Sequence, residues 1–152
     1  MNNTLQNALH VGRFLWPRFG VREGAVLALD FVGTDPPSVG AFPSLTEAEI
    51  LLNHVHVLDQ FENSAELDRE PWYDTSHPDF RAACQLGLLA SECWAAKLRL
   101  EFPEQRFKVF YTQDDNPIVR FHQVRDGEPA FLDERDWAEE IRERRIVIHV
   151  VG

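Results

Sequence analysis

The stretch 77–101 constrains the fold most, because it predicts a long helix with apolar side chains almost all round. Its polar side chains fall on one narrow stripe, and the other positions are mainly Ala, Leu, Cys and Trp: the stripe consists of Arg81, Gln85, Glu92 and Arg99. A surface helix has one apolar face, whereas a helix that is apolar nearly all round has neighbours on several sides. We therefore expect a central helix, with Gly87 as a point where another backbone approaches closely.

A β-hairpin is predicted where "RFKVFYT" and "PIVRFHQVR" flank "QDDN". A loop of odd length places the large apolar side chains together on one face, whereas an even loop scatters them over both: these are Phe107, Val109, Tyr111, Val119 and Phe121. Burial in a core selects the odd loop. We therefore expect Phe121 to be buried and Arg120 and His122 to be accessible on the opposite face.

The other predicted elements are helices over 4–16, over about 46–61 and from Asp133 onward, and strands over 25–32 and 146–151. Thr46 and Glu49 have the spacing of a capping box. The uncharged strand "IVIHVV" is typical of a buried, central position in a sheet. The sum is a single α+β domain over 1–152. It has about four strands in a mixed or antiparallel sheet, packed against the long helix with two or three shorter ones.

Charge and cysteine content narrow the classes of function. The net charge of the 152 residues is −10, which repels phosphate backbones, so we expect no nucleic-acid binding. Cys84 and Cys93 lie nine residues apart on the predicted helix and cannot pair, and free thiols are typical of a reducing compartment such as the cytoplasm. No apolar run approaches the ~18 residues of a membrane span, so we expect no membrane partner.

The stretch "REPWYDTSHPDF" (69–80) combines aromatic, acidic and imidazole side chains. Ser76 lies three residues before Asp79, and Pro78 suits a first helical turn, so we interpret the stretch as a helix start capped by Ser76. The alternative interpretation is an acid–base pair or weak metal site formed by Asp74, His77 and Asp79.

A second candidate metal site is the pair His54 and His56 with Asp59. The two imidazoles would share one face of a strand, but on the predicted helix they point about 200° apart. We therefore predict no metal there. The sequence also lacks the glycine-rich, nucleophile-elbow and C-x-x-C motifs of common cofactor and catalytic sites, so we expect no cofactor.

The second face of the hairpin is basic on an otherwise acidic chain. Its candidate ligand-binding residues are Lys108, Arg120 and His122, because arginine suits bidentate recognition of carboxylate or phosphate. The alternative, which we favour, is that these charges pair with the protein's own carboxylates or stay solvated.

The leading hypothesis for function is a non-enzymatic accessory protein that docks a basic protein partner. Residues 59–79 contain seven acidic side chains against one arginine, and the candidate contacts are Glu66, Asp68, Glu70, Trp72 and Tyr73, with Asp74 and His77. Acidic patches speed association with cationic partners, and aromatic residues anchor such contacts. In size and charge alone the chain resembles small accessory proteins such as toxin-neutralising immunity proteins and inhibitors.

The alternative function is an enzyme or small anionic-ligand binder that uses Arg120 and His122 with Asp74 or His77. A deep cleft with converging polar groups favours this alternative, whereas convex acidic patches without a cleft favour docking. A homo-oligomer built on the helical faces is compatible with both.

Overall fold

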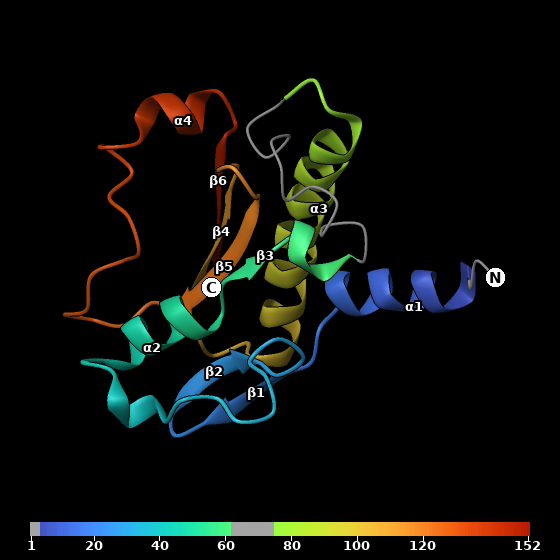
Figure 1. The fold of residues 1–152 in the computed structure, drawn as a ribbon. Helices are drawn as coiled ribbons and strands as arrows, with labels where there is room; N and C mark the ends of the chain where they lie inside the picture. Colours follow the sequence, from blue (N-terminus) through green and yellow to red (C-terminus); the bar gives the residue numbers. More distant parts are fainter. Residues whose placement is uncertain (1–3, 62–74) are drawn as a thin grey trace.

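A four-stranded antiparallel sheet, in the order β3-β5-β4-β6, packs with one face against the long helix α3 (Pro78–Glu101) in the computed structural model, which describes residues 4–61 and 75–152 (Figure 1). Within these residues the other helices are α1 (Thr4–Leu15), α2 (Leu45–Leu52) and α4 (Ala138–Arg142), with short 3-10 turns at Val39–Ala41 and Leu58–Gln60. The strands are β1 (Phe19–Arg22), β2 (Ala25–Ala28), β3 (Val55–His56), β4 (Phe107–Thr112), β5 (Ile118–Gln123) and β6 (Ile146–Val151). The described residues form a single α+β domain, as the sequence predicts.

The predicted hairpin register is confirmed. Val109 pairs with Phe121 and Tyr111 with Val119, which leaves an odd loop over 113–117. The side chains of all four are buried, each at most 1% exposed, because they face α3. Core burial therefore selects the register.

The core is centred on Trp94, in the middle of α3. Its indole is fully buried, donates a hydrogen bond to the carbonyl oxygen of Phe14 at 2.9 Å and stacks on Phe31 at 5.8 Å. This contact joins α1 and the segment after β2 to α3. Gly87 makes room for the ring of Tyr111, since an added Cβ would lie 2.9 Å from it, so the neighbour there is a side chain and not a backbone.

A buried ion pair joins β2, α2 and β5. Glu49, 0% exposed, accepts hydrogen bonds from both terminal nitrogens of Arg125 at 2.9 and 2.7 Å and from the backbone N–H groups of Val26 and Gln123 at 2.8 and 2.6 Å. Thr46 accepts a further bond from Arg125 at 3.1 Å. The predicted capping box is therefore wrong. Thr46 and Glu49 form this buried network, and Ser44 caps α2.

The predicted helix over about 46–61 is also wrong, because α2 ends at Leu52. The side chain of Asn53 accepts a hydrogen bond from Ala28 N–H at 2.9 Å and donates to the carbonyl oxygen of Val26 at 2.9 Å. These bonds satisfy one N–H and one C=O group of β2. The chain then continues as β3, which pairs with β5. The contacts with β2 and β5 therefore outweigh the helical periodicity.

Three further expectations need correction. The last helix begins at Ala138, because Asp133 forms a turn in which it accepts from the backbone N–H of Arg135 at 3.0 Å. β6 is an edge strand and not a central one. The cap of α3 is His77, whose Nδ1 accepts from Asp79 N–H at 3.1 Å, in place of Ser76, although Pro78 does occupy the first turn.

The two cysteines are free and half-buried, and burial raises the pKa of both the Cys84 and Cys93 thiols. His149 on β6 forms a hydrogen bond with the hydroxyl of Ser91 on α3 at 2.9 Å. Within the described ranges no helix is both long enough and apolar enough to cross a membrane.

Candidate functional site

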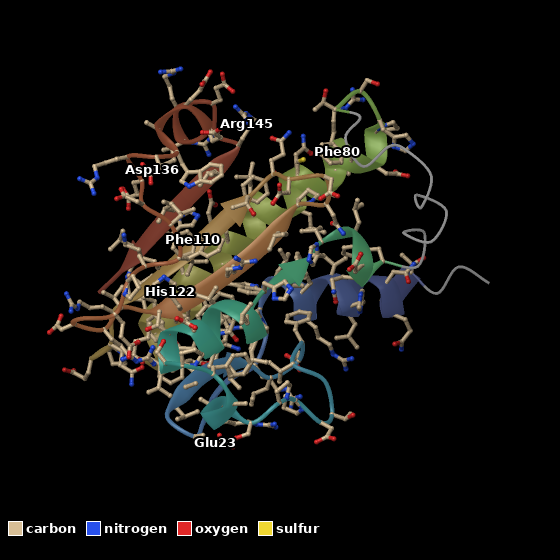
Figure 2. The ribbon with its side chains drawn as sticks, turned by 60° about the vertical axis from the view of Figure 1, so that its left-hand side comes forward. Glu23, Phe80, Phe110, His122, Asp136 and Arg145 are labelled. Atoms are coloured by element: carbon tan, nitrogen blue, oxygen red, sulfur yellow. The ribbon has the colours of Figure 1, made fainter. Side chains whose placement is uncertain are left out.

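A pocket of about 670 Å³ lies on the sheet face opposite α3, beside the hairpin loop. The segment between β5 and β6 encloses it together with the start of α3, and Figure 2 labels two of the residues that line it, Phe80 and Arg145. Its apolar walls come from elements far apart in the sequence: Phe80, Ile118, Phe131, Trp137 and Ile146. Polar groups line it as well, among them Arg120, Asp114 and Asp133.

Among the described residues, Arg120 is the cation of this pocket that forms no ion pair. Its guanidinium carbon lies 4.0 Å from the centroid of the Phe131 ring, and its Nε is buried without a hydrogen-bond partner among the described residues. Burial lowers the pKa of the guanidinium and nearby Asp114 opposes this shift, but an arginine stays charged at neutral pH. A buried arginine nitrogen without an acceptor among the described residues is uncommon, and such a group calls for an acceptor such as water or a ligand.

His122 holds the segment that carries Phe131 against the sheet. Its Nε2 accepts from the backbone N–H of Phe131 at 3.2 Å, and its Nδ1 donates to the carbonyl oxygen of Gln123 at 3.0 Å. A backbone N–H only donates and a carbonyl only accepts, so these contacts fix the neutral tautomer with the proton on Nδ1. Burial lowers the pKa of His122, which agrees with a neutral ring.

The expectation that His122 is accessible is therefore wrong. The ring is 1% exposed and stacks on Phe110 at 5.4 Å, and Phe110 also contacts Phe131 at 5.4 Å. The second face of the hairpin is covered here because the chain after β5 folds back over it. Arg120 is only half-buried and remains at the pocket.

Two other charged side chains of the pocket, Arg145 and Asp133, form ion pairs within the chain. Arg145 lies 2.8 Å from Glu143 and 4.0 Å from Glu140, and Asp133 lies 2.6 Å from Arg135. Lys108, on the same sheet face, pairs with Glu134 at 3.0 Å. For Lys108 the interpretation that basic side chains pair with the protein's own carboxylates fits the geometry, whereas for Arg120 it does not.

Of the remaining predicted binding residues, His77 is the one that the structure describes. His77 caps α3, and the described pocket lining does not include it. The other predicted binding residues lie outside the described residues: Glu66, Asp68, Glu70, Trp72, Tyr73 and Asp74.

His54 and His56 are neighbours, with ring centroids 5.4 Å apart, because β3 replaces the predicted helix. Burial lowers the pKa of His54. Within 4–61 and 75–152, no group of three His, Cys, Asp or Glu side chains is placed to hold a metal ion.

Phe131 and Trp137 are the site residues that sequence reasoning missed. Both lie in the acid-rich stretch 126–143, where large aromatic side chains stand among charged ones. Their position among charged residues could have indicated the site, since a large aromatic side chain in a polar connecting segment needs an apolar surface to pack on.

No protein-family model matches the chain, and comparisons with curated proteins and with solved structures found no significant similarity.

Proposed function

We propose that the protein binds a small anionic ligand with an aromatic or other apolar portion in the pocket at Arg120. The observation that carries this proposal is the charged guanidinium whose buried Nε has no hydrogen-bond partner within 4–61 and 75–152, in a pocket of about 670 Å³. Ligand-binding pockets commonly measure roughly 300–1,000 Å³ and combine apolar walls with a few polar groups.

The geometry supports recognition of a planar anion. A guanidinium binds carboxylate or phosphate through two parallel N–H groups, and the free Nε of Arg120 supplies one of them. Phe131 stacks on the guanidinium at 4.0 Å, which restricts the plane of the fork. The apolar portion of the ligand then contacts Phe80, Ile118 and Trp137.

Carboxylates at the same pocket restrict the charge of the ligand. Asp114 lines it and repels an additional negative charge, whereas Glu140, which also lines it, is partly balanced by Arg145 at 4.0 Å. This arrangement favours a ligand with one anionic group over a polyphosphate.

The hypothesis of docking to a basic protein rests on residues 59–79, of which 62–74 lie outside the described residues, so it stays a prediction. Reversing the charges of Glu66, Asp68 and Glu70 should slow association with such a partner by roughly tenfold at low salt. A cleft lined by polar groups favours a small-ligand binder over a docking protein, so the pocket at Arg120 supports the small-ligand proposal.

The experiment is isothermal titration calorimetry with benzoate and phenyl phosphate as probes. Arg120→Met should weaken binding at least about tenfold, and Arg120→Lys should weaken it less, because lysine keeps the charge but lacks the planar fork. Arg22→Met is the matched control, since Arg22 is an exposed arginine on β1 outside the described pocket. Equal affinities for Arg120→Met and Arg22→Met would contradict the proposal.

A further inference from the structure

In the part of the chain that the structure describes, the four-stranded sheet has one long edge with no further strand beside it, formed by β6 (Figure 2). The opposite edge is β3, which has only two residues. A strand at the edge of a sheet presents unpaired backbone N–H and C=O groups that can pair with another strand. The six residues of β6 therefore form the longer of the two edges with which another strand could pair.

The register defines which backbone groups of β6 are free. Gln113 N–H donates to the carbonyl oxygen of Arg145 at 2.7 Å, and the hydrogen-bonded pairs of an antiparallel ladder alternate from there. The residues of β6 that bond to β4 are therefore Val147, His149 and Val151. The N–H and C=O groups of Ile146, Ile148 and Val150 point away from the sheet, and no described residue hydrogen-bonds to them.

The β6 edge lacks the features that prevent an edge strand from pairing with another chain. Natural edges are blunted by charged residues, proline, bulges or short length. The sequence "IVIHVV" has no formally charged residue and no proline, and its six residues pair with β4 without a bulge. The side chain of Val150 is 61% exposed on this edge strand.

We propose that β6 pairs antiparallel with β6 of a second copy, around a two-fold axis at Ile148. The outward groups lie at Ile148 and two residues to either side, so the edge is complementary to itself. Ile148 then pairs with Ile148 of the second copy, and Ile146 with Val150, through about six hydrogen bonds. The pairing covers the exposed Val150 with an isoleucine from the same face of the other sheet.

A second copy is the favoured occupant because this pairing closes on itself. The two β6 strands pair at the axis, so each outer edge of the combined sheet is the two-residue β3. Because β3 is so short, addition of a third copy at that edge is disfavoured. Each copy has a net charge of −10, so the two repel each other and the dimer is weak at low salt. Dimerisation should therefore strengthen as ionic strength rises, because salt screens this repulsion.

The experiment is sedimentation equilibrium at concentrations from about 5 to about 500 µM, in low and in high salt. We expect the mass to double at high concentration, and at lower concentration in high salt. Val150→Lys places a charge on the edge and should abolish the increase. Val21→Lys is the matched control, because Val21 is also an exposed valine, 59% exposed, on a strand outside this sheet. A single-copy mass for the unmodified protein at all concentrations would overturn the proposal, as would equal dimerisation of the two variants.

Ile148→Pro provides a second variant. Its only effect on the backbone hydrogen bonds is to remove an N–H that points away from the sheet, so the β4–β6 bonds remain while the dimer loses its central pair. Amide hydrogen exchange locates the interface. The amides of Ile146, Ile148 and Val150 should become protected as concentration rises, whereas that of Val147 is protected throughout. A dimer whose new protection lies elsewhere, or a species larger than a dimer, would also overturn the proposal.

Discussion

Replacing Arg125 by methionine is expected to cost about 3–5 kcal/mol of the free energy of unfolding, because it leaves Glu49 charged and buried without its partner. Glu49 is 0% exposed, and two of its four hydrogen bonds come from the Arg125 guanidinium. The backbone N–H groups of Val26 and Gln123 remain, but they carry no net charge to balance the carboxylate. For a domain of this length the loss corresponds to a melting temperature lower by roughly 6–20 °C.

The assay is urea unfolding followed by the fluorescence of the four tryptophans, of which Trp94 is fully buried. Adding Glu49→Gln to Arg125→Met should cost less than the sum of the two single changes, by about 1–3 kcal/mol, because the two residues are directly coupled. Arg135→Met serves as the control, since Arg135 pairs with Asp133 on the surface and its loss should leave the midpoint nearly unchanged. A loss below about 1 kcal/mol for Arg125→Met, or strict additivity, would refute the reasoning.

Phe121→Ala should cost about 3–5 kcal/mol in the same assay, since the ring is fully buried; a loss below about 1 kcal/mol would mean that it does not contribute to the core. His77→Ala should cost about 1 kcal/mol as the loss of a cap, and more than Ser76→Ala; the reverse order would contradict the observed cap. Burial lowers the pKa of His122 below its ordinary value of 6.5, so the unfolded chain takes up the proton first and stability falls as the pH drops below about 6.5. His122→Phe should flatten that fall in unfolding measured between about pH 7.5 and 5.5, and parallel profiles would contradict a neutral, buried ring.

The central helix and the hairpin register could be predicted because both depend on how many apolar side chains need burial. An almost wholly apolar helix requires neighbours on several sides, and α3 contacts α1, β4, β5 and β6. The pairing of Val109 with Phe121 follows from the two-residue period of a strand. Only this register places the large apolar side chains of both strands on the same face of the sheet, where they can be buried.

The end of α2 at Leu52 and the start of β3 could not be predicted from the periodicity of the neighbouring residues. Residues 46–61 have helical periodicity, but Asn53 bonds to Val26 and Ala28, and β3 completes the sheet edge beside β5. These partners lie more than twenty residues away in sequence, so a window of neighbouring residues does not contain them. Tertiary contacts here override local propensity.

The pocket was predicted only in part. Arg120 stood out as a basic residue on the hairpin, but the predicted partner His122 is a buried structural residue. Phe131 and Trp137 complete the site because a connecting segment folds back over the sheet. Such a return depends on packing between distant segments, which neither periodicity nor charge counts describe.

The most direct test of ligand binding at this pocket is the NMR signal of the Arg120 Nε–H group during titration with phenyl phosphate. This N–H is buried and has no partner among the described residues, so a bound anion becomes its hydrogen-bond acceptor. We predict a progressive downfield shift of this signal that saturates together with the shift of the Trp137 indole. An Arg120 signal that stays unchanged while phenyl phosphate binds, or the absence of any shift up to millimolar phenyl phosphate, would contradict the account.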